Sequence, residues 1–111
     1  MKTHPLSVGK TYCLRLPDGR VLGRVRIERL EDSWAEGPFV PTPAFAEFRE
    51  LFERADELAR DHIIPLWEKA ADAIDALRIE VVEEQGEGGH SGLRVFIAEN
   101  EASIGTPLCV S

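Results

Sequence analysis

Four arginines near the amino terminus are the residues whose type and spacing most clearly suggest a binding site. They are Arg15, Arg20, Arg24 and Arg26. If residues 17–19 (Pro-Asp-Gly) form a turn between two strands, alternation places all four side chains on one face of a hairpin. A cluster of guanidinium groups can bind phosphates, carboxylates or an acidic protein surface. The alternative is that the four arginines are solvated or pair with acidic residues of the same chain.

The charge of the chain is unevenly distributed. Residues 1–30 contain seven Lys and Arg against two Asp and Glu, a net charge of +5, whereas the whole chain carries −7, which leaves −12 on the remainder. An acidic protein is a poor general binder of nucleic acid. We therefore expect a protein partner or self-association, with no general nucleic-acid binding.

His62, next to Asp61, is the one candidate for acid–base chemistry. A histidine held by a carboxylate can serve as a general base in a small enzyme, which requires a cleft around it. A histidine near the end of a helix can instead cap the last carbonyl groups. No nucleophile lies at a helical spacing from His62, so we favour the capping role and expect no catalytic residue.

The sequence contains no spacing typical of a metal site. The histidines at positions 4, 62 and 90 do not form an H-x-x-x-H pair, and Cys13 and Cys109 match no zinc pattern. Two cysteines near opposite ends of the chain are predicted to be reduced thiols, although a bridge between them is the alternative. We predict no bound metal and no cofactor.

The glycine-rich segment 86–92 could be mistaken for a phosphate-binding loop. Such a loop usually leads into a helix and ends in Lys-Ser or Lys-Thr, whereas an alternating strand pattern follows this segment. The glycine spacing also does not match a nucleophile elbow. We interpret the segment as a hairpin tip.

The predicted hairpin that would position the arginines spans residues 11–16 and 20–30. Tyr12 and Leu14 alternate onto one face of its first strand, and Val25 lies on the same face of its second. Leu22 breaks the alternation and Gly23 follows it. A β-bulge at Gly23 would turn Leu22 toward the core.

The segment from Trp34 to Phe52 holds five of the eight aromatic residues and three of the seven prolines. Aromatic side chains bury the largest apolar area, so core packing is expected to concentrate here. We predict a polar connection over residues 31–36 and then a rigid, aromatic entry into a helix, with Thr42 as N-cap and Pro43 at the first helical position. The aromatic residues predicted to form the structural core are Trp34, Phe39, Phe45, Phe48, Phe52 and Trp67.

The remaining patterns complete the predicted fold. Apolar residues recur at helical spacing over residues 44–60 and 64–76, with a break at Pro65. Alternation returns at 78–84, continues through Leu93, Val95 and Ile97, and ends in a short strand at 102–104. We predict one α+β domain over residues 1–111. Its antiparallel sheet has two N-terminal strands and two or three C-terminal strands, with two central helices packed on one face.

Trp34, Gly37, Phe39, Pro41 and Phe45 form the motif W-x-x-G-x-F-x-P-x-x-x-F. With this motif the chain resembles a loosely defined group of short, uncharacterised bacterial proteins. The resemblance implies a strand hairpin that leads into the motif, then helices, then a closing hairpin. It implies no activity and no catalytic residues.

The sequence as a whole favours a small acidic protein that acts by binding. No apolar run reaches the roughly 18 residues that cross a bilayer, and the start of the chain lacks the apolar segment of a secretory signal. We expect a cytoplasmic, non-enzymatic interaction or regulatory module, of which an immunity-like protein that neutralises a toxin is one version. The alternatives are a small enzyme at His62 and an anion-binding module at the arginine face.

Overall fold

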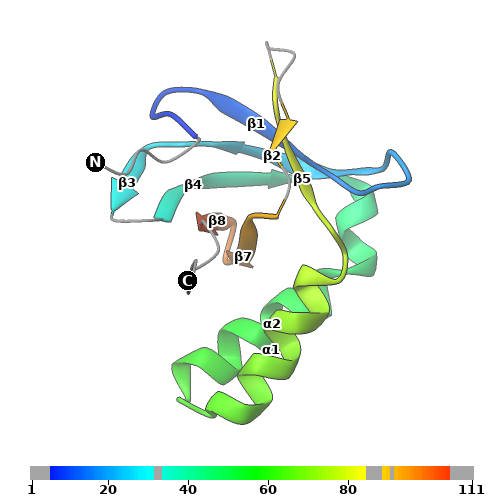
Figure 1. The fold of residues 1–111 in the computed structure, drawn as a ribbon, viewed down its shortest axis with the longest axis vertical. Helices are drawn as coiled ribbons and strands as arrows, with labels where there is room; N and C mark the ends of the chain where they lie inside the picture. Colours follow the sequence, from blue (N-terminus) through cyan, green and yellow to red (C-terminus); the bar gives the residue numbers. More distant parts are fainter. Residues whose placement is uncertain (1–5, 32–33, 85–88, 91, 106–111) are drawn as a thin grey trace.

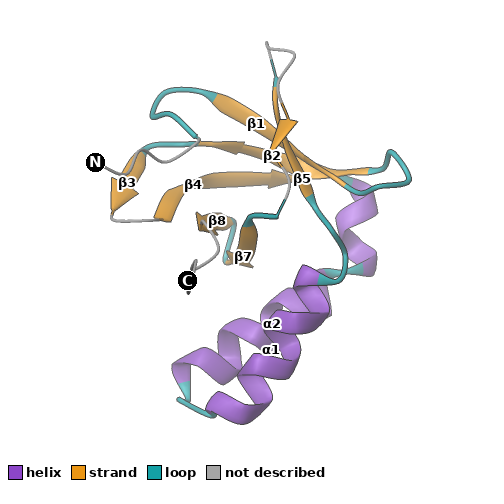
Figure 2. Ribbon diagram, viewed as in Figure 1, coloured by secondary structure: helices purple, strands orange, loops and turns teal. Residues whose placement is uncertain are grey.

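The computed structural model describes residues 6–31, 34–84, 89–90 and 92–105. They form a curled antiparallel sheet, a half-barrel, against which two helices pack (Figures 1 and 2), so the predicted α+β architecture is confirmed. The strands follow the order β6-β5-β1-β2-β4-β8-β7, and β3 pairs with β4. Their bounds are β1 Thr11–Arg15, β2 Val21–Arg26, β3 Arg29–Glu31, β4 Trp34–Pro41, β5 Glu80–Glu83, β6 Gly89–His90, β7 Arg94–Ala98 and β8 Glu101–Gly105.

The first hairpin, β1 and β2, places Tyr12, Leu14 and Val25 on one buried face, as alternation predicted. Tyr12 lies opposite Val25, and Leu14 lies opposite Gly23. The register then shifts, because Arg15 pairs with Val21 and leaves Leu22 as the extra residue. Leu22 is fully buried. The predicted bulge is therefore confirmed: it returns Leu22 to the core face of the sheet.

The segment Trp34–Pro41 is a strand, β4, so the prediction of a polar connection over residues 31–36 was wrong. β4 pairs with β8 on one side and with β3 and then β2 on the other. Pairing with β2 ends at Val25 opposite Phe39, and pairing with β3 begins at Arg29 opposite Glu36. Residues 26–28 therefore lie across from Gly37 and Pro38 without regular pairing. The absent N–H group of Pro38 therefore coincides with a gap in the strand pairing, which explains how a proline fits inside the sheet.

Gly37 is required where the backbone of β4 closely approaches that of Arg26. A Cβ atom added at Gly37 would lie 1.7 Å from the backbone oxygen of Arg26 on the neighbouring strand. No side chain fits at that distance, so only glycine lets the two backbones approach this closely.

The aromatic entry contains two helical segments instead of one continuous helix. Residues Pro43–Glu47 form a 3-10 turn, and α1 begins at Arg49 and ends at Arg60. Thr42 is the N-cap residue of the turn, but its hydroxyl donates to the carbonyl of Val21 and does not cap the helix. α2 spans Ile64–Asp75, close to its predicted bounds. The two helices run alongside each other and lie against the β7 end of the sheet (Figure 2).

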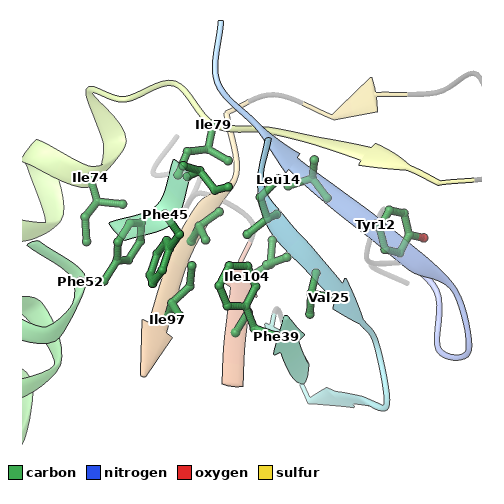
Figure 3. Close-up of a cluster of buried hydrophobic side chains, with 14 of the residues drawn as sticks. Tyr12, Leu14, Val25, Phe39, Phe45, Phe52, Ile74, Ile79, Ile97 and Ile104 are labelled. Carbon is green, nitrogen blue, oxygen red and sulfur yellow. The ribbon is translucent and has the colours of Figure 1, made fainter. Parts of the chain in front are cut away.

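The core lies between the concave face of the sheet and the two helices. In Figure 3, Leu14, Val25 and Ile104 extend from the sheet toward Phe45, Phe52 and Ile74 of the helical segments. Phe39, Phe45 and Phe52 are each at most 3% exposed, and the rings of Phe45 and Phe52 pack 5.5 Å apart, which agrees with their predicted place in the core.

Three of the six predicted core aromatics lie at its margin. Phe48 and Trp67 are partly buried and pack against the core from its edge. Trp34 is also partly buried; its ring packs 5.9 Å from Phe96, which stacks on Trp67 at 5.8 Å. This aromatic row flanks the core where α2 meets β7.

No helix in the described residues is long and apolar enough to cross a membrane.

Candidate functional site

The four arginines of the predicted binding face are all exposed, but most of them have carboxylate partners within the chain. Arg15 pairs with Glu80 of β5, and Arg24 pairs with Glu84 at 3.2 Å. Both ion pairs form because β5 lies beside β1 in the sheet, and the sequence did not reveal this strand pairing.

Arg20 is bound by two carboxylates, Asp18 at 2.8 Å and Glu47 at 3.1 Å. Their hydrogen bonds, that of Asp18 first, raise the pKa of the Arg20 guanidinium above its ordinary value. Within the described residues only Arg26 of the four has no ion pair. The face is thus a network of mixed charge, with little free positive charge for an anionic ligand.

His62 lies in the turn between the two helices and is exposed. Its φ angle is 56°, the left-handed conformation that often ends a helix. Its backbone N–H donates to the carbonyl of Ala59 at 3.2 Å. This placement supports the helix-end role and gives no support to a catalytic cleft around the imidazole.

The histidines, the cysteines and the glycine-rich segment were considered as metal or phosphate sites, and the sequence favoured neither kind of site. Among the residues that the structure describes, no group of three or more His, Cys, Asp and Glu side chains could hold a metal ion. Cys13 is a free, partly buried thiol on β1, and His90 lies on the short strand β6. His4, Cys109 and most of the glycine-rich segment lie outside the described residues.

The structure forms a groove that the sequence did not predict, between α1 and the turn that joins β7 to β8. Its volume is about 490 Å³, within the range of about 300–1,000 Å³ that small-molecule pockets occupy. The floor consists of Phe39, Phe45, Phe52 and Ile97. Three of these four residues belong to the aromatic stretch, which therefore lines a surface feature as well as the core.

The rim of this groove is acidic. It contains four carboxylates, Glu53, Asp56, Glu57 and Glu99, against two arginines, Arg49 and Arg60. One of these arginines, Arg49, makes a cation–π contact with the floor, because its guanidinium lies 5.1 Å from the centre of the Phe45 ring.

The second arginine of the rim joins the two walls. Arg60 of α1 pairs with Asp56 at 2.7 Å and with Glu99 of the β7–β8 turn at 3.5 Å. These two carboxylates, Asp56 first, raise the pKa of the Arg60 guanidinium above its ordinary value. At one end of the groove, these ion pairs of Arg60 therefore link α1 to the β7–β8 turn.

Glu53 and Glu57 remain as the unneutralised carboxylates of the rim. Both are exposed, both lie on α1 one helical turn apart, and neither forms an ion pair with a described residue. Like charges at this spacing destabilise a helix by about 0.2–0.5 kcal/mol. A cation bound between them would remove that repulsion.

The turn that closes the groove is a two-residue hairpin turn with a glutamate at its first position. Glu99 and Asn100 have φ angles of 49° and 65°, as in the two-residue hairpin turns that favour Asn and Gly. Glutamate is uncommon in this conformation. The turn presents the Glu99 carboxylate, 82% exposed, at the groove.

No family model, no curated protein and no solved structure matches this chain. The resemblance carried by the W-x-x-G-x-F-x-P-x-x-x-F motif therefore stays a prediction. The structure accounts for the motif by packing: Gly37 permits a close backbone approach, and the rings of Phe39 and Phe45 meet edge to face at 5.2 Å.

Proposed function

We propose that this protein is a non-enzymatic interaction module that binds a basic segment of a protein partner in the groove between α1 and the β7–β8 turn. The observation that carries the proposal is the combination of an aromatic floor with two unpaired carboxylates, Glu53 and Glu57, on the rim. This function requires no catalytic residue.

The chemistry of the groove matches a lysine or arginine side chain. Such a side chain has an apolar stem that covers hydrophobic surface and a charged head that stays at the rim. The stem would lie over Phe45, Phe52 and Ile97, while the head would meet Glu53 or Glu57. The floor residues are at most 5% exposed, so covering them adds little, and the two carboxylates would supply most of the affinity as well as the association rate.

The charge distribution supports the same class of partner. Arg15, Arg20 and Arg24 of the first hairpin and its turn are neutralised by Asp18, Glu47, Glu80 and Glu84. The net charge of −7 therefore falls mainly on other surfaces, and α1 presents part of it at the groove. A basic surface would be attracted at long range, and the attraction would weaken with added salt.

The two alternative functions have less support. A catalytic role for His62 lacks a surrounding cleft, and anion binding at the arginine face would have to displace three sets of internal ion pairs. An immunity-like role, in which the acidic groove covers a basic region of a toxin, is one form of the proposed function. The free thiol of Cys13 suits the reducing cytoplasm that we propose as its location.

The test uses a peptide of five arginines with a neutral fluorescent label, and a peptide of five glutamates as its counterpart. Anisotropy is measured at about 0.01 M and about 0.15 M salt, where the Debye length is about 30 Å and about 8 Å. The arginine peptide is expected to bind at low salt and the glutamate peptide to remain free. Sedimentation without peptide shows in parallel whether a second copy of the chain occupies the groove.

Two double variants with equal loss of charge locate the binding. Glu53→Gln with Glu57→Gln is expected to weaken binding roughly tenfold, because each exposed ion pair contributes up to about 1 kcal/mol. Glu28→Gln with Glu68→Gln removes two exposed carboxylates that do not line the groove. Equal affinities of the two double variants would show that only net charge matters, and the groove would then be abandoned as the binding site.

A further inference from the structure

A second cavity lies where the curled sheet leaves its two ends unjoined. It is lined by Ile74, Asp75, Arg78, Ile79, Gly92, Leu93, Arg94 and Val95, and its volume is about 490 Å³. These residues come from the end of α2, the entry to β5 and the start of β7. Since β5 and β7 lie near opposite ends of the strand order, the cavity lies at the opening of the half-barrel, beside the end of α2.

The inner wall of this cavity is apolar. Ile74, Ile79 and Val95 are at most 4% exposed, and Leu93 is partly buried beside them. The cavity therefore opens directly onto the core, and an apolar group placed in it would continue the packing of that core.

The net charge of the cavity lining is positive, opposite to that of the acidic groove. Two arginines and one aspartate line it. Arg94 is held in place by α2, because its guanidinium lies 2.9 Å from the Asp75 carboxylate and 4.0 Å from that of Asp72. The second arginine, Arg78, is exposed and forms no ion pair with a described residue.

The backbone of Arg78 is also held in an uncommon conformation. Its φ angle is 54°, and its N–H donates to the Asp75 carbonyl at 3.0 Å as α2 ends. Asparagine or glycine would adopt this conformation at lower cost. The structure thus places a long cationic side chain at the cavity where a small residue would close the helix more easily.

We infer that this cavity binds a small carboxylic acid with an apolar body, the apolar part against Ile79 and Val95 and the carboxylate on Arg78. A guanidinium group offers two parallel N–H donors that match a carboxylate. The neighbouring Arg94 is paired with two aspartates, so it forms part of the cavity wall and does not bind the ligand carboxylate. This site is separate from the groove at Glu53 and Glu57, so either can fail without the other.

The probe is sodium octanoate at concentrations below its micelle formation, followed by two-dimensional NMR of the amide groups. Its neutral and cationic counterparts are 1-octanol and octylammonium. We expect octanoate to shift the amide signals of residues 78–79 and 92–95 and to bind more tightly than either counterpart. Failure of octanoate to shift these signals at millimolar concentration would overturn the inference.

Substitutions separate the charged contact from the apolar one. Arg78→Asn keeps a residue that tolerates the backbone conformation, and we expect it to weaken octanoate binding at least about tenfold, the loss typical of a hydrogen bond to a charged group. Arg54→Gln, on α1 and away from the cavity, removes an equal charge and should leave binding unchanged. Leu93→Trp should fill the cavity and weaken octanoate and octanol alike.

Two results would contradict the assignment. Equal weakening by Arg78→Asn and Arg54→Gln would show a general charge effect. Octylammonium binding as tightly as octanoate would show that the cavity selects only for apolar bodies. The proton–nitrogen spectra of each variant, recorded without ligand, establish that the fold is retained.

Discussion

Replacement of Phe52 by alanine tests the packing on which both the core and the groove depend. Phe52 is 1% exposed and its ring lies 5.5 Å from that of Phe45. A buried phenylalanine removes about 150–250 Å² from water, worth about 4–6 kcal/mol at about 25 cal/mol per Å². Residual structure in the unfolded chain lowers this figure, and measured Phe→Ala changes in cores cost about 3–5 kcal/mol. We therefore expect a loss of about 4 kcal/mol.

Phe48 provides the matched comparison, because it lies four residues earlier on the same segment and is only partly buried. Its ring also contacts the Arg20 guanidinium at 5.6 Å, an interaction of about 0.5–1 kcal/mol when exposed. Because Phe48 stays partly exposed, we expect Phe48→Ala to cost less than Phe52→Ala, about 2–3 kcal/mol with this contact included. This is smaller than the 3–5 kcal/mol expected for a fully buried phenylalanine.

Urea denaturation monitored by circular dichroism measures both losses as shifts in the midpoint at constant slope. At about 4 °C per kcal/mol, Phe52→Ala should also lower Tm by about 16 °C. Equal losses for the two variants, or a loss below about 2 kcal/mol for Phe52→Ala, would show that the position of α1 on the sheet is not the one described here.

Three further changes have defined outcomes. Gly37→Ala should destabilise the protein strongly, since its Cβ would lie 1.7 Å from the Arg26 oxygen, and a wild-type midpoint would refute the close strand approach. Arg24→Glu with Arg26→Glu should change the unfolding free energy by no more than about 1 kcal/mol, because both side chains are exposed; a large loss in thermal unfolding would show that they are structural. Hydrogen bonds from the Arg20 backbone N–H, and then from its guanidinium, lower the pKa of Asp18 below its ordinary 3.8. The ionised Asp18 therefore stabilises the fold above pH 3.8, and this stabilisation is lost as the pH falls through the lowered pKa. Asp18→Asn should therefore differ from wild type in unfolding free energy at pH 7 and converge with it in acid; a difference independent of pH would contradict this.

Local patterns predicted the parts of the fold that depend on neighbouring residues. The break in alternation at Leu22 indicated the bulge, because a glycine followed and a one-residue insertion restores the core face. The break at Pro65 separated the two helices in the same way. The strand at Trp34–Pro41 was missed because Gly37 and Pro38 are both unfavourable in strands, and the gap in pairing that admits them depends on partners distant in sequence.

The candidate sites were harder to predict for the same physical reason. Glu80 and Glu84 neutralise arginines of the first hairpin only because β5 joins the sheet beside β1. The groove likewise forms only when the turn at Glu99 packs against α1. The spacing of Glu53 and Glu57 was visible in the sequence as part of a solvated helix face, and nothing local distinguished it from an ordinary one.

The most direct measurement of the central claim is an NMR titration of the isotopically labelled protein with the peptide of five arginines. The proposed groove predicts that the largest shifts occur in residues 53–60 and 97–100, and that they diminish as salt is raised. Shifts concentrated instead on residues 80–84, the acidic partners of the arginine face, would contradict the claim.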